Sequence, residues 1–204
     1  MHPNPAFRHD DRALFAQLIG EVGFGMVFLA TPDGPRVAHT PLLLRENGRI
    51  GFHLARGNAL VRHLDAATAL VVVNGPDGYV SARWYTDAGQ VPTWNYVTLE
   101  GEGTVSRLDR DGLAALLADV SAHNEARIPG PAWTMDKVPP ATMSRLLDAI
   151  VGFEIDVTAW RSTFKLSQNK PAAERDRLID GLESSGSGAI ATLMRVLGSP
   201  VVGQ

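Results

Sequence analysis

Hydrophobic residues recur along the chain with two periods, and each period predicts a class of element. Short apolar or alternating runs bounded by Gly, Pro and Asn are typical of β-strands, whereas apolar residues three and four positions apart are typical of helices. These patterns predict strands at 26–30, 37–44, 50–54, 69–73, 94–107 and 153–157, with a turn at 74–78 and a hairpin at Asn47–Gly48. They predict helices at about 11–20, 59–66, 109–123, 141–150, 172–183 and 188–197.

The order of these elements favours an antiparallel sheet. Strands follow one another at short spacing with few helices between them, whereas a parallel sheet needs a crossover helix for each strand pair. The sequence therefore predicts a mainly β protein, a β-barrel with flanking helices. We expect a barrel domain at 1–160 and a C-terminal helical extension, packed on the barrel, at 161–204.

Composition excludes several classes of site. The 204 residues are 45% hydrophobic and 20% charged, as in soluble globular proteins, and they include no cysteine. Disulfides, thiolate metal sites and cysteine nucleophiles are therefore excluded. The longest apolar run, 22–30, is too short for a membrane span, and the polar N-terminus does not resemble a signal peptide. We expect a cytoplasmic protein with no membrane partner.

The stretch VPTWNYV at 91–97 is unusual for the start of a strand. Alternation places Thr93, Asn95, Val97 and Leu99 on one face, and Trp94, Tyr96 and Thr98 on the other. Asn95 then lies on an apolar face, where an unpaired amide would cost about 1–3 kcal/mol, so it needs partners. Trp94 and Tyr96 suit a subunit interface or a ligand wall. A half-buried strand with an aromatic pair explains the same pattern.

Two further stretches carry polar groups at chain reversals. In HLARGN, Arg56 and Asn58 stand where a helix is predicted to begin, and free N–H groups with an arginine suit a phosphate. In KLSQNK, Lys165 and Gln168 lie around a turn. An ordinary strand-to-helix corner and a polar linker are the alternatives. His53 reads as a hydrogen-bonded or ligand-lining histidine.

No protein-supplied catalyst is evident. The six histidines lack metal-ligand spacing, and the chain has no GxSxG, no P-loop and no GxGxxG. If the protein performs chemistry, we expect a cofactor to supply it.

Taken together, these stretches resemble a known family. The order HLARGN, GYVSARWY, VPTWNYVTLEGEG, VGFEIDV and KLSQNK, from Pro5 to about Pro171, resembles the FMN-binding negative transcriptional regulators of the PaiB type. The resemblance implies a split-barrel FMN-binding fold related to pyridoxamine-phosphate oxidases and flavin reductases. It also implies a homodimer with FMN at the subunit interface.

The resemblance also implies which residues contact the flavin. The segment His53, Leu54 and Ala55 is expected to line the isoalloxazine ring, and Arg56 and Asn58 to hold the phosphate. Trp94, Asn95 and Tyr96 are expected on the strand that reaches the flavin, and Lys165 and Gln168 on the segment that closes over it. Since the chain has no dinucleotide fingerprint, we expect FMN rather than FAD. Ala59 departs from the proline that the family pattern has after Asn58.

Two functions follow as alternatives. The first is a PaiB-like transcriptional regulator, and the second is a flavin-dependent oxidoreductase acting on a small molecule, so the sequence leaves enzymatic activity open. A ligand-sensing module without turnover is a third. The net charge of −3 lacks the basic footprint of a nucleic-acid binder, and the predicted C-terminal helices are themselves net acidic. We therefore expect no tight direct contact with DNA.

Overall fold

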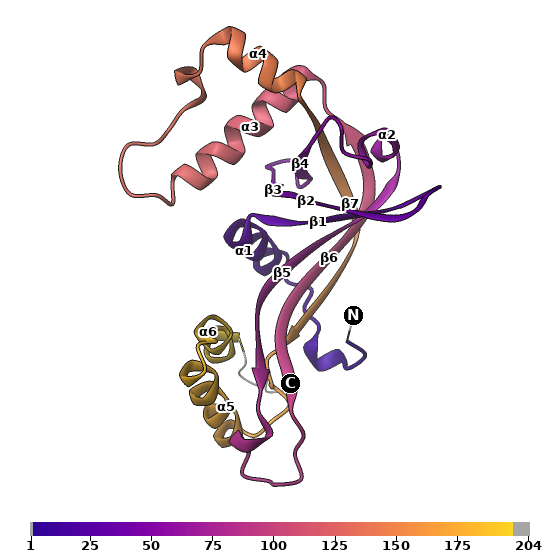
Figure 1. Cartoon of the computed structure of the whole chain (residues 1–204). Helices are drawn as coiled ribbons and strands as arrows, with labels where there is room; N and C mark the ends of the chain where they lie inside the picture. Colours follow the sequence, from indigo (N-terminus) through magenta and orange to yellow (C-terminus); the bar gives the residue numbers. More distant parts are fainter. Residues whose placement is uncertain (1, 198–204) are drawn as a thin grey trace. The chain divides into compact units, whose positions relative to one another are not determined.

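The computed structural model describes residues 2–197, and its strands form one seven-stranded antiparallel sheet (Figure 1). The strand order is β2-β1-β5-β6-β7-β4-β3. The strands are β1 Phe24–Thr31, β2 Gly34–Pro41, β3 Leu43–Leu44, β4 Ile50–Ala55, β5 Thr68–Val80, β6 Thr93–Arg107 and β7 Ile150–Lys165. The α-helices are α1 Arg12–Val22, α2 Val61–Leu64, α3 Arg110–Glu125, α4 Pro140–Asp148, α5 Ala172–Ser184 and α6 Gly188–Leu197. The predicted mainly β class with flanking helices is confirmed.

The chain forms two compact units. One, called the barrel unit, comprises residues 12–73 and 100–160. The other, called the tail unit, comprises residues 2–11, 74–99 and 161–197 of the described chain. The predicted division at residue 160 stays a prediction, and positions 198–204 of the predicted extension lie outside the described residues.

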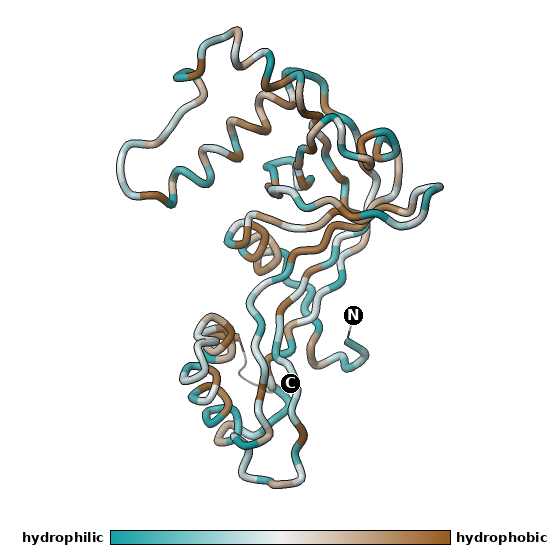
Figure 2. The backbone as a smooth tube through the Cα atoms, viewed as in Figure 1, coloured by the Kyte–Doolittle hydropathy of each residue, from teal (hydrophilic) through white to brown (hydrophobic). Residues whose placement is uncertain are grey.

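The core of the barrel unit lies on one face of β4 and β7. Phe52 stands opposite Phe153 in the ladder, both are fully buried, and their rings stack at 5.5 Å. Burying one such side chain contributes about 1.5–3 kcal/mol. Figure 2 shows the matching hydrophobic stretches along β1 and the first half of β5. On the other face, Gly51 and Gly152 leave room for leucines of α3.

The C-terminal end of helix α1 is held by hydrogen bonds from His123 of α3 and from Arg127, just after α3. His123 Nε2 lies 2.9 Å from the Gly20 carbonyl oxygen, and Arg127 donates to the carbonyl oxygens of Gly20 and Glu21. These carbonyls have no partner within α1, and positive charge is favoured at a helix C-terminus. The contacts therefore tie α1 to α3.

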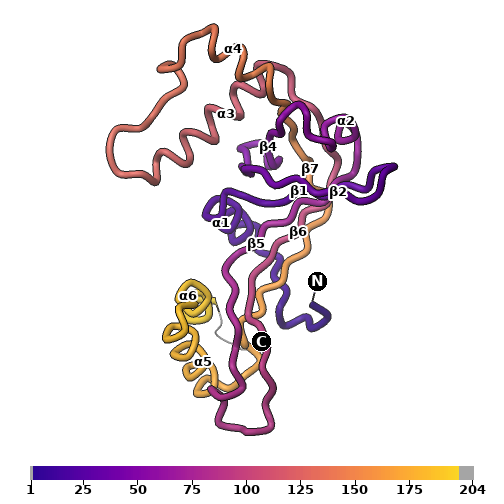
Figure 3. The backbone as a smooth tube through the Cα atoms, in the orientation of Figure 1, coloured from indigo at the N-terminus to yellow at the C-terminus, as the bar shows by residue number. Residues whose placement is uncertain are grey.

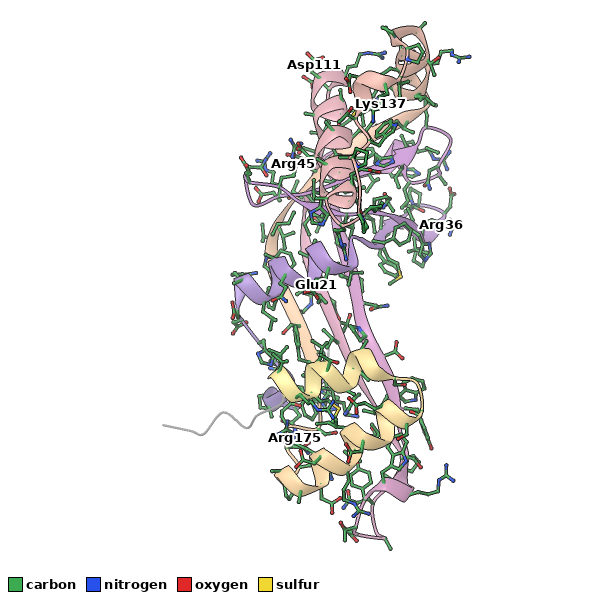
Figure 4. All side chains as sticks on the ribbon, turned by 90° about the vertical axis from the view of Figure 1, so that its left-hand side faces the viewer. Glu21, Arg36, Arg45, Asp111, Lys137 and Arg175 are labelled. Atoms are coloured by element: carbon green, nitrogen blue, oxygen red, sulfur yellow. The ribbon has the colours of Figure 1, made fainter. Side chains whose placement is uncertain are left out.

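In the tail unit, α5 and α6 pack as a pair beside the second half of β5 (Figures 1 and 3). A Cβ at Gly78 would lie 2.8 Å from Leu182 and 2.9 Å from Ile190, so the helices approach the strand closely because this residue has no side chain. Arg175 of α5 is buried and donates to the Met194 carbonyl oxygen near the C-terminal end of α6 (Figure 4).

Three predicted elements differ from the structure. The strand predicted at 37–44 breaks after Pro41, and the Leu42 N–H donates to the Gly23 carbonyl instead of to the sheet. The helix predicted at 59–66 has four residues, because Ala66 adopts a left-handed φ of 60° and its N–H donates to Val105. The turn predicted at 74–78 is continuous strand, and the glycines there do not adopt the positive φ of a turn.

Strand β7 is also longer than the predicted 153–157. Its polar end is stabilised by the N-terminal segment: Ser162 Oγ accepts from the His9 N–H at 2.9 Å and donates to the His9 carbonyl at 2.8 Å. Thr163 accepts from the His2 N–H. Both side chains are buried, so these partners satisfy groups that the sequence pattern counted as loop-like.

Strands β6 and β7 meet closely within the barrel unit. A Cβ at Gly103 would lie 2.0 Å from the Asp156 carbonyl oxygen and 2.8 Å from the Val157 Cα. Because the obstacle is backbone, no rotamer change can relieve it, and any side chain would force the strands apart.

Among the described residues, every helix is too short or too polar to cross a lipid bilayer.

Candidate functional site

Asn95 lies where the predicted alternation placed it, on the buried face of β6. It is fully buried, between the half-buried Thr93 and the buried Val97. Its Nδ2 donates to Ser167 Oγ at 2.9 Å and to Met194 Sδ at 3.2 Å, and Ser167 Oγ donates to its Oδ1 at 3.1 Å. The amide therefore has the partners that burial requires.

Ser167 forms the centre of the turn that follows β7. Its φ of 58° is left-handed, a conformation that costs a non-glycine residue roughly 1–2 kcal/mol. Gln168 stabilises the same turn, because its Oε1 accepts from the Leu166 N–H and its Nε2 donates to the carbonyls of Phe164 and Ala6. Asn95 and Gln168 thus hold this segment through bonds within the chain.

Lys165 ends β7 and is fixed from β6. Its ammonium donates to Thr93 Oγ1 and, at 2.8 Å, to the Trp94 carbonyl oxygen. Burial lowers the pKa of Lys165. These bonds bring the motifs VPTWNY and KLSQNK together, which their separation in the sequence did not reveal.

A cavity of about 270 Å³ opens beside this turn, within the tail unit. Lys165 and Lys170 both line it, with Tyr85, Thr93 and Asn169. Sequence reasoning missed Lys170 and Tyr85. The available signal was the second lysine of KLSQNK, five positions after the first.

The opposite face of β6 carries exposed aromatic residues. Trp94 is 52% exposed and Tyr79 of β5 is 48% exposed, and their rings meet edge to face at 6.0 Å. Tyr96, on the same face, is half-buried. Large aromatic side chains exposed together are typical of interaction surfaces.

In the barrel unit, His53 projects from the face of β4 that α3 covers, because its ladder partner Gly152 packs against Leu113 of α3. Its Nδ1 is buried and has no hydrogen-bond partner among the described residues. Burial lowers the pKa of His53. The neighbouring Leu54 is buried in the core, and Ala55 is exposed at the strand end.

Arg56 and Asn58 follow at the corner after β4. Arg56 Nε donates to the Asp148 carbonyl and its Nη2 to the Ile150 carbonyl at 3.1 Å. Asn58 Oδ1 accepts from the Leu60 N–H. The N–H groups of Leu60 and Val61, at the start of the four-residue α2, are therefore already bonded to Asn58, which weakens the case for a helix-start phosphate site at this corner.

Two arginines that sequence reasoning missed accompany Arg56. Arg107 and Arg110 line, with Arg56, a cavity of about 240 Å³ that Gly152 also borders. Arg110 pairs with Asp148 and donates to Ser144. Arginine forks beside the first turn of the 16-residue α3 suit a phosphate. The sequence signal was RLDRDG at 107–112, read only as a helix cap.

The predicted site residues thus form two groups. One group lies in the barrel unit: His53, Leu54, Ala55, Arg56 and Asn58. The other lies in the tail unit: Trp94, Asn95, Tyr96, Lys165 and Gln168. Among residues 2–197, no cluster of His, Asp and Glu is arranged to hold a metal ion.

Comparisons with known proteins identify the family of the chain. The model of the family "Putative FMN-binding domain" matches residues 1–159. The chain is 33% identical over 171 residues to the protease synthase and sporulation protein PAI 2 of Bacillus subtilis, with 81% of each chain covered.

Solved structures share the fold at low sequence identity. The FAD and heme binding protein of Mycobacterium smegmatis matches with a TM-score of 0.60 at 18% identity, covering 83% of this chain and 78% of that one. The flavocytochrome Anf3 of Azotobacter vinelandii matches with a TM-score of 0.61 at 15% identity, covering 80% and 72%. These likenesses confirm the predicted split-barrel fold.

Proposed function

The chain belongs to the family of putative FMN-binding domains, and on that premise we propose that it is a homodimeric flavoprotein with FMN at the subunit interface. We further propose that it acts as a PaiB-like negative transcriptional regulator. The 33% identity to the PAI 2 protein of Bacillus subtilis supports the regulatory role.

The donor groups of the barrel unit fit FMN. The cavity with Arg56, Arg107 and Arg110 is lined by three guanidinium groups and one carboxylate, that of Asp109. Arg110 is already paired with Asp148, so Arg56 and Arg107 are the groups available to a phosphate dianion. Arg56 retains a free Nη1 after its two carbonyl contacts, and the Arg107 guanidinium has no partner among the described residues. This cluster is the observation that carries the proposal, because a terminal phosphate distinguishes FMN from riboflavin.

The ring system has a candidate partner nearby. His53 Nδ1 is a buried polar atom without a partner, and such groups usually have one. A polar edge of the flavin at β4 would satisfy it. When bound, FMN supplies reversible electron transfer, and the chain's own residues hold and shield it.

From the tail unit, Trp94 and Tyr96 join the proposal as an aromatic surface that contacts the second subunit, and their contact with the flavin stays a prediction. Asn95 and Gln168 position the segment, since their side chains bond within the chain. The role of Lys165 at the flavin stays a prediction.

Flavin-dependent oxidoreduction is the second candidate. Its support is the FMN-binding family itself, because a bound flavin can carry electrons to or from a small molecule.

Reconstitution tests the proposal. The purified protein, freed of bound flavin, is titrated with FMN, riboflavin and FAD by flavin fluorescence, and its mass is measured by light scattering. The proposal expects FMN to bind at least tenfold more tightly than riboflavin, to a dimer. Equal affinities for FMN and riboflavin would show that the arginine cavity does not bind the phosphate. A monomeric mass would show that there is no subunit interface. Oxidation of NAD(P)H by the reconstituted protein would favour the oxidoreductase.

A further inference from the structure

The cavity of the tail unit contains most of the chain's lysines. The sequence has only three, Lys137, Lys165 and Lys170, and the last two line this one cavity of about 270 Å³. Among the described residues that line it, none is acidic. Two ammonium groups in one cavity repel each other, and an anion bound between them would offset this repulsion.

The chain fixes both lysines by neutral groups. Lys165 donates to Thr93 Oγ1 and to the Trp94 carbonyl oxygen. Lys170 donates to Gln90 Oε1 at 2.7 Å and lies 5.3 Å from the centroid of the Tyr85 ring. None of these direct partners carries a negative charge. The Asp87 carboxylate, which accepts from Gln90 Nε2 at 2.8 Å, does not line the cavity but attracts Lys170 electrostatically. Each ammonium also has three donors, so both keep hydrogen-bonding capacity.

The turn between Lys165 and Lys170 is held in one conformation by contacts with β6. Ser167 adopts its left-handed φ of 58° and is held by Asn95 from β6. Strained backbone that its surroundings enforce is concentrated at ligand sites. Here the strained residue stands between the two lysines and itself lines the cavity.

The remaining lining indicates what the ligand resembles. Tyr85 and Phe7 supply aromatic walls, and Thr93 and Asn169 supply neutral donors. At about 270 Å³ the cavity lies below the usual size of drug-sized ligand pockets, about 300–1,000 Å³. It therefore suits a compound with one ring rather than the three-ring flavin.

We propose that the tail-unit cavity binds a small organic anion, a single-ring compound bearing a phosphate or carboxylate group, as a second ligand distinct from the flavin. Lys165 and Lys170 bind the anionic group, and Tyr85 packs against the ring. The site is complete in one chain and does not depend on FMN.

Calorimetric titration of the full chain without flavin tests this. The probes are phenyl phosphate, benzoate and the neutral benzyl alcohol. We expect at least one anion to bind at least tenfold more tightly than the alcohol. Binding of phenyl phosphate alone assigns the site to phosphates, and binding of benzoate alone assigns it to carboxylates. No binding of either anion at millimolar concentration overturns the proposal.

Variants locate the site. Lys170→Gln should lower the affinity for the anion about tenfold to hundredfold, as expected for the loss of one charged hydrogen bond. The matched control is Lys137→Gln, which removes the lysine of the barrel unit and should leave the affinity unchanged (Figure 4). Asn169→Asp places a carboxylate in the lining at an exposed position, where folding is not at risk, and should weaken the anion but not the alcohol.

The competing explanation is that the tail-unit cavity binds the phosphate of FMN rather than a second ligand. If Lys170→Gln weakens FMN more than riboflavin, the cavity holds the flavin phosphate, and the second-ligand proposal is wrong. If anion affinity is the same in Lys170→Gln and Asn169→Asp as in the unmodified chain, the anion binds elsewhere, which also overturns it.

Discussion

Asn95 and Ser167 exchange hydrogen bonds in the buried core of the tail unit, with Nδ2 to Oγ at 2.9 Å and Oγ to Oδ1 at 3.1 Å. The pair joins the strand entrance VPTWNYV to the turn KLSQNK, two stretches that are 72 residues apart. A polar residue on an apolar strand face is thereby explained, because Asn95 bonds to the residue at the left-handed position of the turn.

Replacing Asn95 by Ala should lower the free energy of unfolding by about 1–3 kcal/mol, because the Ser167 hydroxyl loses its partner in a buried place. Urea denaturation followed by circular dichroism measures this. Trp94→Ala, one residue earlier on the exposed face, is the control and should change stability much less. Equal losses would mean that the pair is not a structural link.

Two substitutions of Ser167 distinguish the cost of its backbone strain from the contribution of its hydrogen bond to stability. Ser167→Ala and Ser167→Gly both remove the hydroxyl, but only glycine tolerates a φ of 58°. We expect the glycine variant to be the more stable of the two by about 1 kcal/mol, as measured by the same denaturation. An alanine variant as stable as the glycine variant would show that the turn relaxes out of the left-handed region.

Arg56→Ala should weaken FMN by about one to two decades, the value of one charged hydrogen bond, and affect riboflavin much less. Fluorescence quenching of both flavins measures the difference. Because Arg56 also donates to two backbone carbonyls, a purely structural role would reduce both affinities alike. Arg36→Ala, an exposed arginine of β2 outside the arginine cavity, is the matched control.

Trp94→Arg should convert the predicted dimer into a monomer, because it places a charge on the exposed aromatic face shared with Tyr79. Light scattering measures the mass against the 21.9 kDa of one chain. Trp133→Arg changes a tryptophan of similar exposure in the barrel unit and should leave the mass unaltered. A dimer that survives Trp94→Arg would place the interface elsewhere.

Stability should fall as the pH is lowered below about 6.5, and His53 should contribute to the fall. Burial lowers the pKa of His53 from its ordinary 6.5, so the unfolded chain binds a proton more readily than the folded one. Its contribution is fully present above 6.5 and is lost as the pH falls from there toward the folded value. His9, whose pKa is also lowered mainly by burial, acts in the same direction.

Thermal unfolding at pH of about 7.5 and about 5.5 checks this. His53→Gln should reduce the difference in melting temperature between the two, whereas His39→Gln, at an exposed position of β2, should not. A difference unchanged in His53→Gln would show that the imidazole becomes solvated in the folded state.

The protein alone should not bind DNA tightly at physiological salt. The net charge is −3, and release of counterions from DNA requires clustered Lys and Arg. Gel shifts with operator-sized duplexes at low and physiological salt measure this. A complex that persists at the higher salt would contradict the expectation and assign the regulatory role to direct DNA contact.

Local chemistry was readable from the sequence where neighbours in the chain determine it. Asn47–Gly48 gives the β3–β4 hairpin with Gly48 at a φ of 79°, and Asp109 caps α3 by accepting from the Gly112 N–H. The alternation of β6 was equally visible, because the strand period fixes which side chains share a face.

Contacts between distant segments were not readable. Gly78 reads as a turn residue, yet it serves the close approach of α5 and α6 to β5. Gln168 was predicted only as a flavin contact, and its bond to the Ala6 carbonyl, 162 positions away, could not be foreseen. Arg107 and Arg110 lie beside Arg56 because β7 is between β6 and β4 in the sheet. Such approaches depend on tertiary packing, which overrides local propensity.

Gly103 has a consequence for how the sequence can change over evolution. The Asp156 carbonyl occupies the space of any side chain there, although the backbone at Gly103 itself is not left-handed. Substitution of Gly103 is therefore prevented by the backbone of the neighbouring strand β7 and not by the φ and ψ angles of Gly103 itself. Homologues that keep the close approach of β6 to β7 should carry glycine at this position, and a homologue with any other residue should show the two strands displaced.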